Sequence, residues 1–529
     1  MSVVTTAPSA CELPGVLDAM AGNDASLIIF RRNGARAVEV THARCRAEAG
    51  ALAAALRARG CGPGAVVAIH GATGYEWVLA DLACVLAGAL SVALYPSAPV
   101  PRVVATAVES GCRTVFTDNR DAVEAFRAAG LDVIFLGSPP HGIESVDELV
   151  EQADAKERTA PAPARTGPFT VVSTSGTLSE PKLFTVAAAP LLYTMDRFAE
   201  IYGFGRGDRL LLYLPLSHLP QRMMLYWGLR AGLDFVLSDP AHMAADSATL
   251  QPTLHVTVPR VLEHVRWRVA TNTRGENVPR AAAYRAVFGD AIRAIFVGSA
   301  PTDPALMAEL IEADLPVFEV YGTTELGMIG LNRPDARRPG TVGKPIPWGE
   351  VRLDEETREV LVRTPTPFLH GRLTAGGIEE KVWDPERFEP TADVGEIDAD
   401  GFLRVLGRLR DFTVLPSGEK VFVAPIETAL AVATGAGLCQ LTTLPEGKLG
   451  ALLFFEPGGV PGSRDLEAAV QGVNRSLHPW ERVRAYAVID RLPTVEEGCL
   501  TETTKPRRHV IDEVHGSKAD WQPLKAVPS

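Results

Sequence analysis

The sequence lacks most features that would place the protein outside the class of soluble globular proteins. Its longest basic run is the tetrapeptide Lys505–Arg508, and the formal net charge of −12 argues against nucleic acid as the main partner. None of the seven cysteines has CxxC or CxxH spacing, so we expect neither a disulfide framework nor a structural zinc site. The N-terminus lacks the charged start and apolar core of a signal peptide, and the most apolar window, Leu79–Tyr95, contains Asp81 and is too short to span a membrane. We therefore expect a cytoplasmic protein in a reducing compartment.

The composition is that of a large folded protein. Of its 529 residues, 46% are hydrophobic and 22% are charged, and the chain contains no internal repeats or low-complexity tracts. A chain of this length is too long for a single compact core, so two or more domains are expected.

Strand-like and helical segments alternate along the first 340 residues. The expected strands are Ala65–His70, Ala89–Tyr95, Thr114–Thr117, Arg209–Leu214, Phe235–Leu237, His255–Val258, Ala294–Val297 and Val317–Val320. The expected helices are Thr41–Arg59, Tyr75–Ala87, Arg102–Ser110, Arg222–Ala231 and one that begins near Pro259. This alternation indicates parallel βαβ units with helices on both faces of the sheets.

The pattern changes near residue 340. Short β-rich segments among Gly, Pro and Asp predict a small β subdomain, and the last 120 residues or so carry their own strands and helices. The predicted fold class is therefore α/β, with a large N-terminal region of stacked α/β sheets, a small β subdomain and a smaller α+β C-terminal domain.

The stretch Val171–Lys182 has the character of a phosphate-binding loop. Two β-branched residues are followed by Ser and Thr hydroxyls around Gly176, and Lys182 adds a positive charge. Backbone N–H groups in a tight turn, hydroxyl donors and an ammonium group suit a polyphosphate. The spacing is not that of a Walker loop, and the same composition is also typical of an ordinary surface turn.

Two further loops follow predicted strands, Gly298–Pro301 and Tyr321–Glu325. Ligands of open α/β sheets bind beyond the carboxyl ends of the strands. We therefore expect both loops to lie close to the loop that follows Val172.

Together these segments resemble the motifs of the adenylate-forming superfamily, which contains acyl-CoA synthetases, aryl-CoA ligases, luciferases and peptide-synthetase adenylation domains. The phosphate loop of the family is similar to Thr174–Lys182, and its G-G-A-P segment is similar to Gly298–Pro301. The family motif Y-G-x-T-E is matched by Tyr321–Glu325, and T-G-D is represented by Thr391–Asp393. The G-R pair that precedes the hinge in the family corresponds to Gly407–Arg408. The closest resemblance is to long-chain acyl-CoA synthetases, carried by Leu214–His218, Val258–Arg260, Pro339–Pro345, Gly395–Leu403 and Leu500–Lys505.

This resemblance implies an ATP- and Mg²⁺-dependent enzyme that activates a small carboxylic acid as an acyl-adenylate and transfers it to coenzyme A. It assigns residues 1–408 to an adenylation core and 411–529 to a mobile domain, with a hinge near Arg410. Glu325 would bind Mg²⁺, Thr324 would lie near the α-phosphate, His218 near the acyl carboxylate, and Lys505 would bridge the acid and the α-phosphate. The implied nucleotide-binding residues are Thr174, Ser175, Gly176, Thr177, Lys182, Gly298, Ser299, Ala300, Pro301, Tyr321, Gly322, Thr323, Asp393 and Arg408, of which Asp393 would hold the ribose hydroxyls.

Each assignment has a purely structural alternative. Glu325 would be favoured in the first turn of a helix, and Asp393 would suit the cap of a turn. Lys182 and Lys505 would serve as solvated surface lysines, and His218 as a hydrogen-bonded core histidine. The apolar segment Arg222–Arg230 suits either an acyl tunnel or plain core, whereas Gly327–Leu331 is expected to border a pocket for an aliphatic or aromatic acid.

Four residues depart from the family pattern in loops that face the nucleotide or the thiol, namely Leu178, Ser179, Ala392 and Ser417. They leave open an enzyme that acts on an unusual acid or on another oxyanion, or one whose acceptor is a carrier-protein thiol or an amine. They also leave open a catalytically silent nucleotide-binding protein.

Overall fold

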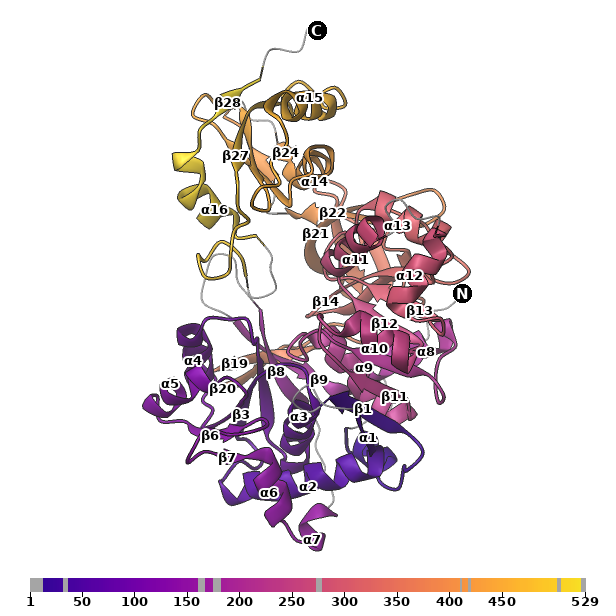
Figure 1. Ribbon diagram of the computed structural model, residues 1–529, viewed down its shortest axis with the longest axis vertical. Coiled ribbons are helices and arrows are strands. Elements are labelled where there is room, and N and C mark those ends of the chain that lie inside the picture. The colour runs from indigo at the N-terminus through magenta and orange to yellow at the C-terminus, as the bar shows by residue number, and fades with distance from the viewer. Residues whose placement is uncertain are drawn as a thin grey trace.

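The computed structural model describes residues 13–31, 37–159, 167–174, 182–272, 278–409, 412–416, 420–501 and 506–524. Within these residues the strands form two nine-stranded sheets, two four-stranded sheets and one two-stranded sheet. Figure 1 shows the two large sheets and their helices as the main body, with the C-terminal elements at one end beyond β21 and β22. The predicted α/β class is confirmed.

The first large sheet combines a parallel half with an antiparallel edge. Its spatial order is β7 (Glu144–Ser145), β6 (Asp132–Phe135), β5 (Thr114–Thr117), β3 (Val66–His70), β4 (Leu90–Leu94), β8 (Pro168–Thr174), β9 (Lys182–Ala187), β19 (Leu369–Thr374) and β20 (Gly377–Glu380). Neighbours from β7 to β8 are parallel, as predicted, and those from β8 to β20 are antiparallel. The direction reverses at β9 because residues 175–181 are too few to form the crossover that a parallel neighbour requires.

The second large sheet is also parallel at its centre and antiparallel at both edges. Its spatial order is β2 (Ala37–Thr41), β1 (Leu27–Arg31), β11 (Asp234–Leu237), β10 (Arg209–Leu212), β12 (Leu254–Thr257), β13 (Ala294–Val297), β14 (Val317–Thr323), β15 (Gly327–Leu331) and β16 (Lys344–Pro345).

Helices from both halves share one apolar core with the two sheets. This core draws on α2 (His42–Ala58), α3 (Tyr75–Ala87), α8 (Ala188–Tyr202) and α9 (Leu219–Ala231). The other helices of the body are α1 (Leu13–Met20), α4 (Val100–Glu109), α5 (Val123–Ala128), α6 (Val146–Gln152), α7 (Ala155–Arg158), α10 (Met243–Leu250), α11 (Pro259–Asn272), α12 (Arg280–Phe288) and α13 (Pro304–Glu312). Among the described helices, none is both long enough and apolar enough to cross a membrane.

The apolar face of α9 is core. Met223, Met224 and Trp227 are buried in the shared cluster, which supports the core interpretation of this segment. In the same way Ile329 and Leu331 of β15, which we expected at an acyl pocket, are buried at 0% and 1% exposure.

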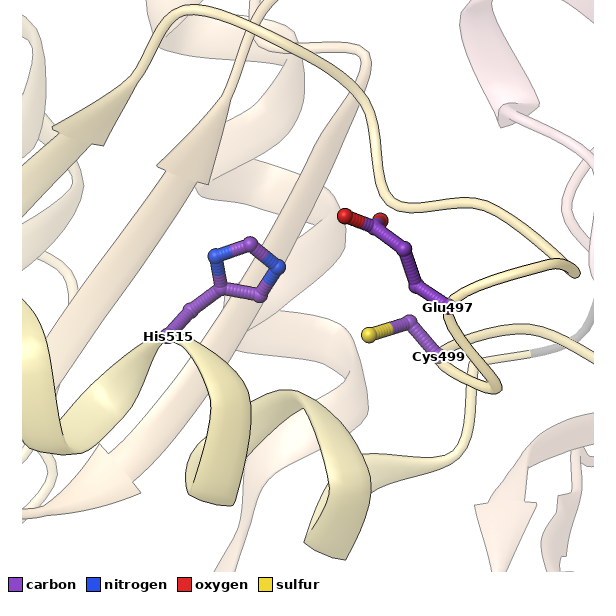
Figure 2. Close-up of side chains that lie close together, drawn as sticks. All are labelled: Glu497, Cys499 and His515. Carbon is purple, nitrogen blue, oxygen red and sulfur yellow. The ribbon is translucent and has the colours of Figure 1, made fainter.

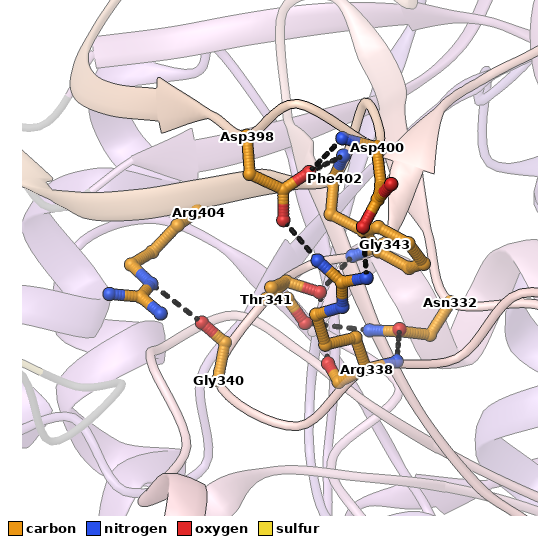
Figure 3. A network of polar contacts seen from close by, with 9 residues as sticks. All are labelled: Asn332, Arg338, Gly340, Thr341, Gly343, Asp398, Asp400, Phe402 and Arg404. Atoms are coloured by element: carbon orange, nitrogen blue, oxygen red, sulfur yellow. Dashed lines mark hydrogen bonds and ion pairs between the residues drawn. The ribbon is translucent and has the colours of Figure 1, made fainter.

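The β subdomain is an antiparallel sheet in the order β17 (Glu350–Leu353), β18 (Glu359–Arg363), β21 (Glu389–Ile397) and β22 (Leu403–Arg408). Arg338 attaches the hairpin between β21 and β22 to the main body (Figure 3): it forms ion pairs with Asp398 and Asp400, and its guanidinium lies 4.2 Å from the ring centroid of Phe402. Two segments that the sequence analysis matched to the same family, Pro339–Pro345 and Gly395–Leu403, are in contact: Val342 N–H donates a 2.9 Å hydrogen bond to the carbonyl oxygen of Leu403, and Leu403 N–H donates one of 2.8 Å to that of Gly343. Arg404 adds a hydrogen bond of 3.2 Å from Nε to the carbonyl oxygen of Gly340.

The C-terminal elements have a separate core. They comprise the hairpin β23 (Phe412–Val414) and β24 (Lys420–Phe422), and a sheet in the order β25 (Leu438–Thr443), β26 (Leu449–Phe454), β27 (Val483–Ile489) and β28 (Gln522–Pro523). The helices are α14 (Val423–Thr434), α15 (Ser463–Asn474) and α16 (Arg508–Val514). Two buried apolar clusters contain only residues after 410, which is the basis of the separate fold of this region.

Candidate functional site

The segment expected to bind phosphate connects two antiparallel strands. Thr174 ends β8, Lys182 begins β9, and the two residues are paired across the hairpin. The buried strand expected before the loop is confirmed, since Val171 and Val172 are 0% and 5% exposed, and Lys182 is exposed. The rest of the segment lies outside the described residues, namely Ser175, Gly176, Thr177, Leu178, Ser179, Glu180 and Pro181.

Gly298–Pro301 follows β13 at the carboxyl end of the second sheet, as expected. A Cβ atom on Gly298 would lie 2.9 Å from the carbonyl oxygen of Val320, so this position requires glycine. Ser299 has a φ of +71°, in the left-handed region that non-glycine residues seldom adopt. Ser299, Ala300 and Pro301 are exposed, which leaves their edge accessible to a ligand.

His218 and Ser299 are brought together from two strands of the second sheet. His218 immediately precedes α9, and its Nε2 lies 3.2 Å from Oγ of Ser299, 81 positions later in the chain. His218 is half-buried, whereas a core histidine such as His255 is completely buried. The structure therefore places His218 at the edge of the Gly298–Pro301 loop and not in the core.

The Tyr321–Glu325 motif differs from the loop predicted at this point. Strand β14 extends to Tyr321, Gly322 and Thr323, because these three residues pair with the antiparallel strand β15. Thr324 and Glu325 form the connecting turn, in which Thr323 Oγ1 accepts a 3.0 Å hydrogen bond from the backbone N–H of Leu326. The helical alternative for Glu325 is therefore wrong.

Two close backbone approaches fix this turn. A Cβ atom on Gly322 would lie 2.5 Å from the carbonyl oxygen of Gly327, so the tight hairpin requires glycine. The carbonyl oxygen of Glu325 accepts hydrogen bonds of 3.0 Å from the N–H groups of Phe368 and Leu369. Because β19 pairs with β9, these bonds join the turn of the second sheet to the edge of the first.

Asp393 is held by groups from two other strands. It is 5% exposed, its Oδ2 accepts a 2.5 Å hydrogen bond from the hydroxyl of Tyr321, and its Oδ1 lies 2.9 Å from Nε of Arg408. Burial, followed by the charge of Asp393, raises the pKa of Tyr321 well above its usual value, so the phenol keeps its proton. Three residues from three predicted motifs therefore form one contact cluster, and Asp393 is more than the cap of a turn.

Ala392 shows how the chain tolerates one departure from the family pattern. Its φ is +60°, the conformation that explains glycine at this position in relatives. The exposed alanine keeps that conformation, and its N–H donates a 2.7 Å hydrogen bond to Oε1 of Glu359. The local backbone around Asp393 is thus preserved at the cost of strain.

A buried acid beneath the site escaped the sequence analysis. Glu319 is 4% exposed in the middle of β14, and its Oε1 accepts a 3.1 Å hydrogen bond from the N–H of Thr302, just after the Gly298–Pro301 loop. Burial raises the pKa of Glu319 to about 7. The signal that could have revealed it is a single charged residue inside the apolar run Val317–Val320.

The donors present suit a nucleotide with one hard cation. Glu325 offers a half-buried carboxylate at the turn, the kind of oxygen ligand that Mg²⁺ prefers when phosphates and water complete its shell. A Cβ atom at Gly298 or Gly322 would meet a backbone carbonyl oxygen, and the carboxylate of Asp393 is a two-oxygen acceptor of the kind that suits a diol. Lys505, Arg410 and Ser417 lie outside the described residues.

The described candidates gather at the carboxyl edge of the second sheet. Ser299 follows β13, and Tyr321 lies near the end of β14 with Glu325 in the turn beyond it. His218 precedes α9, and Asp393 reaches the same edge from β21. This is the region where open α/β sheets bind their ligands.

Comparison with known proteins agrees with this arrangement. The sequence matches the family of AMP-binding enzymes over residues 19–377. It is 26% identical over 554 aligned residues to the long-chain-fatty-acid–CoA ligase FadD15 of Mycobacterium bovis, covering 90% of this chain and 91% of that protein.

Solved structures share the fold. The O-succinylbenzoate coenzyme A synthetase MenE of Bacillus subtilis, in complex with AMP, superposes with a TM-score of 0.75 at 21% identity, covering 94% of this chain and 97% of that one. The anthranilate CoA ligase AuaEII, in complex with anthranoyl-AMP, gives a TM-score of 0.78 at 18% identity, with 94% and 96% covered.

Proposed function

The chain belongs to the family of AMP-binding enzymes, and from this premise we propose that it is an AMP-forming acid–thiol ligase. It would join a carboxylic acid to ATP as an acyl-adenylate with release of pyrophosphate, and then transfer the acyl group to the thiol of coenzyme A. FadD15, 91% of whose length is covered by the match, is named for the ligation of a long-chain fatty acid to coenzyme A. We propose an apolar acid as substrate because the curated relatives include ligases of long-chain fatty acids and of indoleacetate.

One observation carries the proposal: the hydrogen bond between Tyr321 and Asp393 brings together two nucleotide motifs that lie 72 positions apart. Asp393, oriented by Tyr321 and Arg408, would accept hydrogen bonds from the ribose hydroxyls. Adenylation requires positioning and neutralisation of charge more than covalent chemistry by the protein, which suits a site of fixed donors and acceptors.

We assign the remaining groups by their place around this cluster. Glu325 would hold Mg²⁺, which supplies charge neutralisation at the phosphates. The hydroxyls and N–H groups of residues 174–177, with Lys182, would bind the phosphates, and Thr324 would contact the α-phosphate. His218, fixed by Ser299, would border the carboxylate of the acid, and Lys505 would bridge the acid and the α-phosphate.

The test is pyrophosphate release with ATP, Mg²⁺ and a panel of acids, with and without coenzyme A, followed by mass spectrometry of the product. Acid-dependent pyrophosphate release and an acyl-CoA product are expected. An acyl-adenylate that coenzyme A does not consume would indicate a carrier-protein thiol or an amine as acceptor. ATP binding without acid-dependent pyrophosphate release would overturn the proposed activity.

Lys505→Ala provides the matched variant for this assay. It is expected to abolish adenylation while ATP affinity and thermal stability stay close to those of the unmodified protein. Lys518→Ala, in the same C-terminal region, is the control and should retain turnover. Normal turnover in Lys505→Ala would discard the assignment of this lysine without discarding the ligase activity.

A further inference from the structure

A second group of potential ligands lies in the C-terminal region and contains none of the residues assigned to adenylation. Glu497, Cys499 and His515 each offer a ligand atom, and these atoms all lie within 4.8 Å of one another. No other group of three or more His, Cys, Asp or Glu side chains within the described ranges meets this condition. Figure 2 shows the imidazole, the thiol and the carboxylate turned toward a common point.

His515 is the least satisfied member of the group. It is 9% exposed, and its buried Nε2 has no hydrogen-bond partner among the described residues. A buried ring nitrogen without a partner costs free energy unless a ligand satisfies it.

The thiol of Cys499 lies in a dry, apolar environment. Cys499 is 0% exposed and belongs to a small core with Leu452, Phe454 and Ile511. The ring of Phe454 also packs edge-on against His515, at 5.1 Å between centroids. Such surroundings limit the access of bulk solvent and hold both side chains in place.

The carboxylate of Glu497 is already oriented. It forms an ion pair with Arg491 through Oε1, and its Oε2 accepts hydrogen bonds from N–H and Oγ1 of Thr494, at 3.2 and 3.3 Å. Each carboxylate oxygen has two lone pairs, so these contacts leave room for one more. Arg491 also places a positive charge nearby, so a bound dication would either displace its guanidinium from Glu497 or bind the same carboxylate beside it.

The backbone brings the three ligands together before any ion binds. Leu500 N–H donates a 3.1 Å hydrogen bond to the carbonyl oxygen of Thr494, which closes the turn that carries Glu497 and Cys499. On the other side, Arg507 N–H donates a 2.8 Å hydrogen bond to the carbonyl oxygen of Cys499, just before α16, and His515 immediately follows that helix. Side-chain shifts of about 1 Å would bring the ligand atoms to the spacing of a tetrahedral site.

We propose that Glu497, Cys499 and His515 form a binding site for a zinc ion. One thiolate, one imidazole and one carboxylate are the ligand types that Zn²⁺ takes, and three protein ligands leave a fourth position for water. Binding replaces the proton of the Cys499 thiol, which is released to solvent. The ion would tie together the two ends of the segment 499–515, which includes Lys505.

The spacing of the cysteines led us to expect no structural zinc site, which is the opposite of this proposal. Zinc motifs are read from pairs of ligands a few residues apart, whereas Cys499 and His515 are separated by 16 positions and by α16. The fold, and not a sequence motif, brings them together.

Zinc content tests the proposal on the whole chain after its affinity tag has been removed. The protein is stripped with a chelator, incubated with excess ZnCl₂, desalted and analysed for metal. About one zinc ion per chain is expected, with a higher melting temperature in the zinc-loaded form. Cys499→Ser and His515→Gln should lose the bound zinc and the thermal shift, whereas His509→Gln, an exposed histidine on the same helix, should retain both.

A second measurement keeps the test decisive if a buried variant folds poorly. Co²⁺ in place of Zn²⁺ should give a thiolate-to-cobalt charge-transfer band in the unmodified protein, and Glu497→Gln, at a partly exposed position, should weaken Co²⁺ binding without unfolding. Absence of stoichiometric zinc and of the cobalt band would overturn the site. Zinc retained by both Cys499→Ser and His515→Gln would place the ion elsewhere and overturn it equally.

Discussion

The hydroxyl of Tyr321 donates a 2.5 Å hydrogen bond to Asp393, and Arg408 approaches the other oxygen of the same carboxylate at 2.9 Å. Tyr321 belongs to the second large sheet, whereas Asp393 and Arg408 are paired across the β21–β22 hairpin. The contact therefore fixes the β subdomain against the main body at the point where the ribose is proposed to bind.

Tyr321→Phe is expected to weaken ATP binding with little effect on folding. It removes one charge-assisted hydrogen bond from Asp393, an interaction worth roughly 1–3 kcal/mol, so KM for ATP should rise about 5- to 100-fold. KM is measured by pyrophosphate release against ATP concentration at saturating acid. Tyr193→Phe on α8, a half-buried tyrosine near Arg197, is the control. An unchanged KM for ATP in Tyr321→Phe would contradict the role given to Asp393.

Arg222→Met is expected to destabilise the main body strongly. Arg222 and Asp81 are both completely buried and form an ion pair at 2.6 Å, and Arg222 also donates to Thr170 at 2.7 Å and to Ser91 at 3.0 Å. Removal of one partner leaves a buried uncompensated charge, at a cost of about 3–5 kcal/mol. Thermal unfolding of the purified variant measures the loss.

Two further variants make that experiment specific. Arg230 lies on α9, like Arg222, and forms a partly exposed pair with Asp196 of α8, so Arg230→Met should cost less than about 1 kcal/mol. The double change Asp81→Leu with Arg222→Met leaves no uncompensated buried charge and should recover part of the stability. The recovery is partial because Tyr226 loses its acceptor and Thr170 and Ser91 lose a donor. If Arg222→Met and Arg230→Met have equal melting temperatures, the buried network does not stabilise the body as proposed.

The alternation of strands and helices was readable from the sequence because it depends on local apolar periodicity. α3 has the predicted bounds, Tyr75–Ala87, and so do the strands Thr114–Thr117 and Ala294–Val297. The antiparallel edge of the first sheet was not readable, because the partners of β9 include β19, which lies far along the chain. Long-range pairing of this kind leaves no mark on local periodicity.

The site was readable only in part, for a similar reason. Gly298 and Gly322 could be singled out because their motifs require backbone approach, and the structure shows the carbonyl groups that a Cβ would meet. Neither the 3.2 Å contact of His218 with Ser299 nor the burial of Glu319 follows from a motif, since each depends on how neighbouring strands are placed.

Glu319→Gln is expected to change how stability depends on pH. The folded-state pKa of Glu319 is about 7, above its usual value of 4.5, because burial disfavours the carboxylate. A group whose pKa is raised on folding contributes its full stabilisation below about pH 4.5 and loses it as the pH rises through 7. Glutamine does not titrate and still accepts the hydrogen bond from Thr302, so the variant should become the more stable protein as the pH rises.

The measurement is the difference in unfolding free energy or melting temperature between the two proteins from pH 4.5 to 8. The difference should grow in favour of Glu319→Gln up to about pH 7 and then level off, with an upper bound of about 3 kcal/mol. Glu312→Gln, at the end of α13, controls for removal of a charge. A difference that does not vary with pH would show that Glu319 titrates as an ordinary acid.

Ala392→Gly is expected to stabilise the protein and to leave the ribose site intact. Ala392 has a φ of +60° and is exposed, so the substitution removes strain in the left-handed region without creating a cavity. The relief should exceed the entropy that glycine adds to the unfolded chain, for a net gain of about 1 kcal/mol. Ala129→Gly, at an exposed alanine with a φ of −80°, has no strain to relieve and should lower stability. If Ala392→Gly lowers the melting temperature as much as Ala129→Gly does, the alanine is not strained, and the departure from the family glycine carries no energetic cost.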